Sequence, residues 1–280
     1  LSRSPVGVHV DSAHHTAMVR LAANLSFLFK ERPFLDRFQA AAAAGFRAVE
    51  FMFPGDGAYI ASADEVAQRL ASHKLEQVLL NAPAGDWGKG ERGLGGISGR
   101  EAEFQQSIET GLGYCERLGC ARMHVMAGMT AHGATEEVFA QRLRWAAERV
   151  EPHGVTLLVE ALNPRDFPGY LVPDATTALR LVEQAGHASV RLQLDTYHLH
   201  ATEGPDLHGA FRRLLPYAAH VQYANPPGRN EPGVGELDFG PLCTLLDEQG
   251  YEGHVGLEYK PSTQATAQSF AGWGAAHGLA

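Results

Sequence analysis

Short runs rich in apolar and β-branched residues alternate along the chain with longer stretches in which apolar residues recur every three or four positions. Runs of the first kind are typical of buried strands, and stretches of the second kind are typical of amphipathic helices. The predicted strands lie at residues 21–29, 47–53, 75–81, 121–127, 155–162, 190–196, 218–224 and 254–260. Strands that alternate with helices form parallel βα units, and this number of units predicts an α/β fold closed into a (β/α)₈ barrel, the TIM-barrel architecture.

Glycines and long loops show how these units are joined. PFLDRFQAAAAAG ends at Gly45, and the helical stretches before the fifth, sixth and eighth strands also end in glycine, which suits a left-handed helix stop. No linker divides the chain, so we expect a single barrel domain at residues 21–280 after an N-terminal extension at residues 1–20. The three longest loops are residues 82–99, 163–173 and 225–240. All three follow strands, and active sites of such barrels are built from the loops at the strand ends.

Composition and charge narrow the classes of partner. Hydrophobic residues make up 45% of the 280-residue chain and charged residues 20%, which supplies enough apolar material for a large core. The net charge is −9, and because nucleic-acid binding needs a basic face, we expect no nucleic-acid partner. The three cysteines show no CxxC spacing, and no apolar run approaches the roughly 20 residues that span a membrane. These features favour a cytoplasmic protein without a membrane partner.

Four polar side chains interrupt the last four predicted strands near their carboxyl ends. They are Glu160, Asp195, Gln222 and Glu258. Buried carboxylates without a partner are costly, and carboxylates packed together repel one another, so a bound divalent cation would remove both objections. Because three carboxylates and an amide are hard oxygen ligands, the predicted cofactor is one Mn²⁺ or Mg²⁺ ion. The alternative for each residue alone is an ordinary salt bridge or a helix cap.

Two residues near this cluster are candidates for binding a substrate. His198 follows Asp195 by three positions, where the strand turns into its loop, and is placed to contact a substrate oxygen. Arg229 lies in the Pro- and Gly-rich loop after Gln222, and its planar guanidinium matches a carboxylate, which suggests a small acidic substrate. The alternative for Arg229 is an ion pair with Glu231 or Glu236.

Three further side chains are candidates for the rim of the same site. Glu50 ends the second predicted strand, and Asn163 with Asp166 follows the fifth. We expect Glu50 and Asn163 to contact substrate, with a purely hydrogen-bonding scaffold role as the alternative. His124, near the end of the fourth strand, either lines the pocket or is packed in the core, and packing is the preferred interpretation.

The letters GKGERG in the loop at residues 82–99 match the glycine spacing of a dinucleotide-binding fingerprint. That fingerprint needs a strand immediately before it and a helix that opens at its glycines, whereas this segment lies in the middle of a loop. We therefore expect a lid near Trp87 that excludes water, and no nucleotide site.

At these residues the sequence resembles the hydroxypyruvate isomerase family, within the larger group of xylose-isomerase-like barrels. The resemblance covers nearly the whole chain from about residue 22 and includes NLSFLFKERPFLDRF, AAAAGFRAVEFMFP, NAPAGDWGKGERGL, NPRDFPGY and HVQYANPPGRNEPGVGELDF. It implies that Glu160, Asp195, Gln222 and Glu258 bind the metal while His198 and Arg229 face the substrate. Sugar epimerases of the same group generally have histidine at the position of Gln222, so glutamine favours the isomerase branch. The likeness also suggests a homo-oligomer.

The expected activity is the metal-dependent isomerisation of a short hydroxy-oxo acid, hydroxypyruvate to tartronate semialdehyde, through an enediolate. Glu160 and Glu258 are the predicted proton-transfer residues, and which of them is the base stays open. The alternatives are a 2-oxo-tetronate isomerase or a ketose 3-epimerase, which keep the chemistry and change the substrate. More distant alternatives are a metal-dependent endonuclease, which the net charge argues against, and a non-catalytic barrel that binds a small acid.

Overall fold

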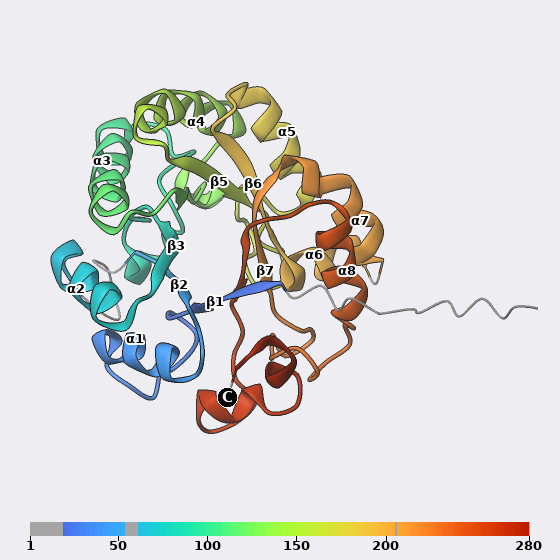
Figure 1. Cartoon of the computed structure of the whole chain (residues 1–280). Helices are drawn as coiled ribbons and strands as arrows, with labels where there is room; N and C mark the ends of the chain where they lie inside the picture. The colour runs from blue at the N-terminus through green and yellow to red at the C-terminus, as the bar shows by residue number, and fades with distance from the viewer. Residues whose placement is uncertain (1–18, 54–60, 205, 280) are drawn as a thin grey trace, which may run out of the picture.

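A computed structural model describes residues 19–53, 61–204 and 206–279 of the chain (Figure 1). Eight parallel strands close into one barrel in sequence order, and helices surround it. The strands are β1 (Arg20–Asn24), β2 (Ala48–Phe51), β3 (Glu76–Asn81), β4 (Arg122–His124), β5 (Thr156–Glu160), β6 (Val190–Asp195), β7 (Ala218–Tyr223) and β8 (His254–Leu257). Each lies within or overlaps its predicted run, which confirms the (β/α)₈ barrel. Of the predicted N-terminal extension, all but the last two residues lie outside the described part, and β1 begins at Arg20.

The helices follow the strands in the expected alternation. They are α1 (Phe34–Ala43), α2 (Ala63–His73), α3 (Glu101–Leu118), α4 (Glu136–Val150), α5 (Ala175–Ala185), α6 (Thr196–Glu203), α7 (Leu207–Leu214) and α8 (Gly240–Glu248). The predicted glycine stops are present, since Gly154, Gly186 and Gly250 have positive φ angles of 70°, 62° and 67° just before β5, β6 and β8. Within the described residues, no helix combines the length and apolar character that crossing a bilayer requires.

The first predicted strand is wrong beyond Asn24. The apolar letters LSFLF continue the strand pattern, yet they form a turn because the Asn24 side chain accepts a hydrogen bond from the backbone N–H of Ser26 at 3.0 Å. The backbone carbonyl of Asn24 then accepts from the N–H of Leu28 at 2.8 Å. This turn brings the side chain of Phe27 to the barrel mouth, where it lines a cavity.

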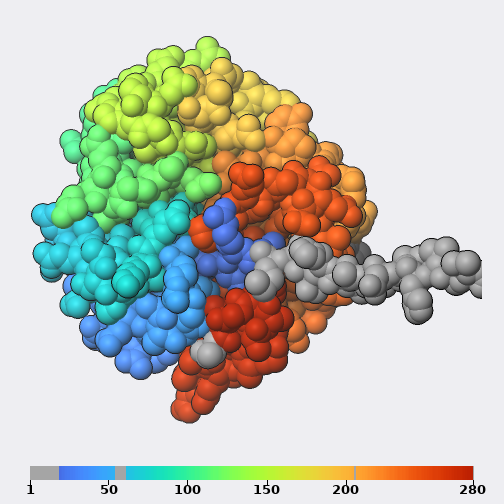
Figure 2. All heavy atoms as spheres, viewed as in Figure 1, coloured from blue at the N-terminus to red at the C-terminus, as the bar shows by residue number. Residues whose placement is uncertain are grey.

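The C-terminal segment packs against the loop that joins α1 to β2. Phe270 packs against Phe46 with a ring-centroid distance of 5.5 Å, and Figures 1 and 2 show this red segment beside the blue first helix. Gly45 has φ of 99°, and a Cβ there would lie 2.4 Å from the carbonyl oxygen of Gly278. The glycine that the sequence predicts as a helix stop is therefore also required by close contact with the far end of the chain.

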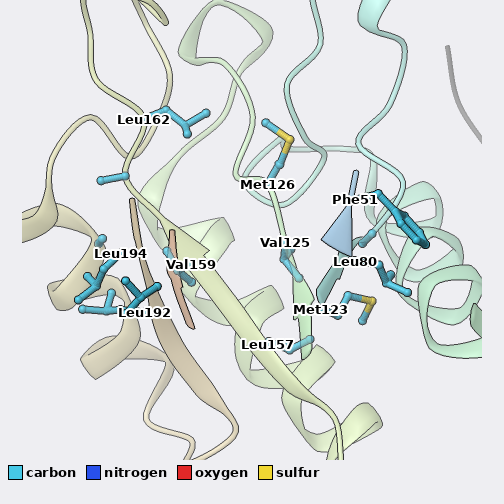
Figure 3. Close-up of a cluster of buried hydrophobic side chains, with 14 of the residues drawn as sticks. Phe51, Leu80, Met123, Val125, Met126, Leu157, Val159, Leu162, Leu192 and Leu194 are labelled. Carbon is cyan, nitrogen blue, oxygen red and sulfur yellow. The ribbon is translucent and has the colours of Figure 1, made fainter. Parts of the chain in front are cut away.

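The main hydrophobic core lies outside the barrel wall, between the strands and the helices. Leu157 and Val159 of β5 and Leu192 and Leu194 of β6 belong to it, and Figure 3 shows them along neighbouring strands. Because side chains of a strand alternate between its faces, the residues between them point into the barrel. A small apolar cluster of Ala22, Ala48 and Val78 forms separately from the main core.

The barrel interior above that small cluster is polar. Gln193 of β6, His220 and Gln222 of β7 and Glu50 of β2 are all buried there and joined by hydrogen bonds across the barrel. An interior of this kind departs from the packed branched side chains that usually fill such barrels. Buried polar groups need hydrogen-bond partners, and these residues supply them to one another. The resulting network holds in place the side chains at the carboxyl ends of the strands.

Candidate active site

A cavity of about 150 Å³ opens at the carboxyl ends of the strands. Its polar lining is Asn24, Asn81, His124, Glu160, Gln193, His198, Gln222, Arg229 and Glu258, and its apolar lining is Phe27, Phe51, Met52, Leu79, Trp87, Met126, Leu162 and Phe167. A larger hollow of about 680 Å³ lies between the loop that contains Trp87 and α3. Its lining includes no buried charged residue, so the smaller cavity is the candidate site.

Three of the four predicted metal ligands line this cavity, and the fourth lies directly beside it. Glu160 and Asp195 are the last residues of β5 and β6, and both are buried. Their oxygens and a ring nitrogen of His198 lie within 4.8 Å of one another. Gln222 lies beside Asp195 in the strand register, and Glu258 follows the last residue of β8. Parallel strands of one barrel end on the same side, which explains why residues so distant in sequence meet.

Burial controls the protonation of these carboxylates. Desolvation, followed by the charges of Glu258 and Asp195, raises the pKa of Glu160 well above its usual range. Desolvation also raises the pKa of Glu258 to about 8, against the opposing effect of Arg229. Protein groups alone therefore do not hold every carboxylate of the cluster ionised at neutral pH.

The donor set fits a hard divalent cation. Glu160 Oε1 is buried and has no hydrogen-bond partner among the described residues. A carboxylate oxygen without a partner in the protein is available as a ligand, and a cation beside it would offset the repulsion between Glu160, Asp195 and Glu258. Gln222 can add an amide oxygen to the set. The chemistry of these donors suits Mn²⁺ or Mg²⁺.

Glu50 orients that amide from inside the barrel. Its buried carboxylate accepts hydrogen bonds from Gln222 Nε2 at 2.6 Å, from His220 Nε2 at 2.6 Å and from Asn24 Nδ2 at 2.9 Å. The carboxylate holds the NH₂ group of Gln222 toward the barrel interior, and Oε1 accepts from Gln193 Nε2 at 2.8 Å. Glu50 is not among the residues that line the cavity, so its position suits the scaffold alternative better than contact with substrate.

Arg229 lies among the acids. Its Nη2 donates to Asp195 Oδ2 at 3.0 Å and to Glu258 Oε2 at 2.9 Å. The guanidinium carbon lies 4.8 Å from the ring centroid of Phe27 and 5.2 Å from that of Tyr197, so two aromatic rings hold the side chain. Its backbone has φ of 59°, in the left-handed region that non-glycine residues rarely adopt.

The alternative pairing of Arg229 with loop acids is wrong. Glu231 accepts hydrogen bonds from the backbone and hydroxyl of Ser262, and Glu236 lies 3.7 Å from His200. Arg229 instead occupies the mouth of the barrel, where its guanidinium lines the cavity as predicted. Because its guanidinium already pairs with Asp195 and Glu258, it can attract a negatively charged ligand once a metal cation offsets the charge of those two acids.

His198 lines the cavity in a defined tautomer. Asn163 donates to its Nδ1 twice, from the backbone N–H at 3.1 Å and from the side-chain amide at 2.8 Å. The orientation of that amide is set by Asp166, whose N–H donates to Asn163 Oδ1 at 3.0 Å. Since Nδ1 accepts, the proton lies on Nε2, which is 3.9 Å from Asp195 Oδ2. Burial lowers the pKa of His198 well below its usual range, so the ring is a neutral hydrogen-bond donor.

Two residues of the cavity lining differ from the sequence predictions, since one was expected to be packed in the core and the other was not predicted. His124 lines the cavity instead of being packed in the core, and burial lowers its pKa to about 3. Gln193 also lines it, although no motif singles it out. A signal for Gln193 exists in the sequence, because it precedes Asp195 by two residues and therefore lies on the same face of β6.

The loop near Trp87 contributes one wall. Trp87 begins a short 3₁₀ turn at Trp87–Lys89, and its ring stacks against Arg92, whose guanidinium carbon lies 4.1 Å from the ring centroid. α3 begins only at Glu101, so the glycines of GKGERG do not open a helix. The segment thus lacks the strand–glycine–helix context of a dinucleotide site, in agreement with the prediction.

Comparison with known proteins places this geometry in a family. A family model described as xylose isomerase-like TIM barrel matches residues 38–275. The chain belongs to this family. This xylose isomerase-like barrel is 41% identical to a protein named 2-oxo-tetronate isomerase from Cupriavidus necator, over 89% of this chain and 96% of the relative. It is 39% identical to the hydroxypyruvate isomerase of Escherichia coli, with the same coverage of both chains.

Two solved structures have the same barrel fold. A crystal structure titled AP endonuclease, family 2, from Brucella melitensis has a TM-score of 0.87 and 44% identity, over 93% of this chain and 99% of that chain. A D-psicose 3-epimerase from Clostridium cellulolyticum has a TM-score of 0.69 at 19% identity, over 89% and 87% of the two chains. The second likeness shows the fold alone.

Proposed function

We propose that this barrel is a metal-dependent isomerase of short 3-hydroxy-2-oxo acids, with the conversion of hydroxypyruvate to tartronate semialdehyde as its simplest reaction. The supporting observation is the cluster of the buried Glu160 and Asp195 with the half-buried Glu258 beside Arg229. One oxygen of Glu160 has no hydrogen-bond partner among the described residues. Relatives named for isomerases of such acids, at 39% and 41% identity, support the same class of reaction. Both substrates in those names carry a carboxylate, which suits Arg229.

The ligands of the cation would be Glu160, Asp195, Gln222 and Glu258. When bound, the cation would supply the positive charge that polarises the substrate carbonyl and makes the neighbouring C–H bond more acidic. Glu50 would hold the Gln222 amide through the 2.6 Å hydrogen bond from Nε2, and the amide oxygen, which accepts from Gln193, keeps a second lone pair for the cation. This arrangement leaves the protein side chains to bind the substrate and to move its proton.

Proton transfer would fall to Glu160 and Glu258, at the ends of strands β5 and β8. One carboxylate removes the proton from the hydroxyl-bearing C3, the electron pair of that bond forms the enediolate, and a proton is returned to C2. The hydroxyl proton of C3 is transferred to the oxygen on C2, so substrate and product have the same composition. In the metal-free protein burial raises the pKa of Glu258 to about 8, and a cation beside the carboxylate would lower that pKa and favour the ionised form that accepts a proton.

Three other residues would bind and shield the substrate. Arg229 would hold the carboxylate, since its guanidinium is already fixed between Phe27 and Tyr197. His198 would donate its Nε2 proton to an enediolate oxygen, because Asn163 occupies Nδ1. Trp87 would exclude water from the cavity that it lines.

The decisive experiment follows the proton. Purified protein is incubated with hydroxypyruvate in deuterated water, with and without Mn²⁺, and product is tested for carbon-bound deuterium. We expect deuterium in the product only with the metal present. Glu258→Gln is expected to slow labelling by ~10²- to 10⁴-fold, the usual contribution of a general acid or base. A variant that labels at the full rate would refute the role of Glu258.

A second candidate substrate has a specific observation in its favour. The relative named 2-oxo-tetronate isomerase is as similar to this chain as the hydroxypyruvate isomerase. A 2-oxo-tetronate carries the same carboxylate, carbonyl and hydroxyl on its first three carbons, followed by one additional hydroxymethyl group. The same residues would therefore catalyse both reactions, and comparison of kcat/KM for the two acids separates them.

The remaining classes are less well supported. The resemblance to ketose 3-epimerases is at the level of the fold. One solved relative is titled an AP endonuclease, but the net charge of this chain is −9, and the described residues contain one cluster of metal-binding type rather than several. A binding protein without activity would retain a small acid and show no labelling. Turnover of hydroxypyruvate in that experiment would rule out a binding protein without activity.

A further inference from the structure

His124 is a buried polar side chain whose interactions the isomerase chemistry does not explain. It ends β4, is 2% exposed and lines the cavity. Its Nε2 has no hydrogen-bond partner among the residues that the structure describes. Its Nδ1 lies 3.8 Å from Glu160 Oε2, beyond hydrogen-bonding distance. Buried ring nitrogens are normally paired, so an unpaired one in a cavity wall indicates a contact with a ligand.

The position of His124 determines which part of a ligand it reaches. Arg229 lies on the loop after β7 and contacts Glu258, directly after β8. β4 lies across the closed barrel from β8. A substrate with its carboxylate at Arg229 crosses the acids and directs its other end toward β4. His124 is therefore placed at the end of the substrate opposite the carboxylate.

The same cavity has apolar lining residues, among them Leu79, Trp87 and Met126, and few polar groups can therefore bind the far end of a substrate. Asn81, the neighbour of His124 in the strand register, is a second polar group of this lining. A hydroxyl both donates and accepts, so it can pair with Nε2 in either tautomer of the ring. A second carboxylate would lie close to Glu160 and be repelled.

We propose that His124 is a specificity-determining residue whose Nε2 binds the terminal hydroxyl of a four-carbon substrate, so that the site prefers a 2-oxo-tetronate to hydroxypyruvate. This inference rests on the proposed function, because it places the substrate carboxylate at Arg229. Hydroxypyruvate lacks the fourth carbon and its hydroxyl, and therefore leaves Nε2 without a partner.

Three substitutions test the contact at one atom. His124→Leu removes both ring nitrogens with little change in volume. His124→Gln extends an amide to about the position of Nε2, whereas His124→Asn ends near the position of Nδ1 and serves as the matched control. Each variant is assayed with hydroxypyruvate and with 2-oxo-tetronate in saturating Mn²⁺, and its melting temperature is recorded.

We expect His124→Leu to lower kcat/KM for 2-oxo-tetronate by ~10- to 100-fold and that for hydroxypyruvate by less than about threefold. His124→Gln should restore most of the preference, and His124→Asn should not. Equal losses on both substrates, or equal behaviour of the Gln and Asn variants, would overturn the assignment while the isomerase proposal stands. If the wild-type protein isomerises neither acid, the proposed function fails and this inference with it. The Gln and Asn pair decides the question even if His124→Leu does not fold.

Discussion

Asn163 donates two hydrogen bonds to Nδ1 of His198, one from its backbone and one from its side chain. This relationship assigns the imidazole proton to the nitrogen that lies toward Asp195 and the cavity. The side-chain bond should therefore matter for catalysis although Asn163 does not line the cavity.

Asn163→Ala removes the side-chain hydrogen bond to His198. We expect kcat to fall by ~10- to 100-fold, as is usual when a residue that orients a catalytic group is removed, with a smaller change in KM. Asn163→Asp is the matched variant, because it keeps the shape but cannot donate to Nδ1. Steady-state kinetics with hydroxypyruvate give kcat and KM for both variants. Full activity of the Asp variant would show that catalysis does not need the side-chain hydrogen bond to Nδ1, since the backbone bond remains.

Arg229 is expected to select for a carboxylate. Arg229→Lys keeps the charge but loses the planar fork and its fixed position between two rings, so binding of the substrate analogue glycerate should weaken by ~10- to 100-fold. Binding is measured by calorimetry in the presence of Mn²⁺. Arg212→Lys, on the exposed face of α7, is the control and should bind glycerate normally. Unchanged affinity in Arg229→Lys would place the carboxylate elsewhere.

Metal binding should stabilise the fold through Glu160. A ligand that binds only the folded state raises the free energy of unfolding by ~2.7 kcal/mol at one hundred times its Kd. We expect Mn²⁺ to raise the melting temperature of the wild-type protein, and Glu160→Gln to abolish most of that increase. Glu231→Gln is the control, since Glu231 is also buried but binds Ser262. A retained increase in Glu160→Gln would show that binding of the cation does not need the negative charge of Glu160.

His124 should make the metal-free protein less stable in acid. Burial lowers its pKa from 6.5 to about 3, so the folded protein binds its proton more weakly than the unfolded chain. The stability that depends on the neutral ring is complete above pH 6.5 and is lost as the pH falls toward 3. Over this range its contribution declines by about 1.4 kcal/mol per pH unit. Urea unfolding at several pH values should show a shallower decline for His124→Gln than for wild type. Parallel declines would contradict the lowered pKa of His124.

The repeating pattern of the chain predicts most of the fold because the pattern is local. Alternation of strand and helix periods placed all eight strands, and the glycines before β5, β6 and β8 marked real helix stops. The exception is the run after Asn24, where one side-chain hydrogen bond to Ser26 turns an apolar segment away from the sheet. Hydrophobicity does not encode that competition between side chain and backbone.

For the candidate site, too, the sequence indicates some residues, whereas the roles of others are visible only in the structure. Glu160, Asp195, Gln222 and Glu258 could be found from sequence because a polar residue at the end of an apolar strand is anomalous in any barrel. Glu50 shows the same anomaly, but its role depends on three partners from β1 and β7. His124 also ends its strand, and the sequence left open whether it lines the pocket or is packed in the core. Only the position of the cavity shows that it lines the pocket.

The sequence by itself determined the barrel, the end at which its polar strand residues gather and the acidic character of that end, since all three follow from residue periodicity and strand direction. Tertiary structure alone decided that Arg229 lies between Asp195 and Glu258 and that Asn163 sets the position of the His198 proton. It also decided that His124 Nε2 has no hydrogen-bond partner in the described part of the chain. Whether such side chains pair or stay without a partner depends on ångström-scale distances between residues distant in sequence. Those distances are set only once the barrel has closed.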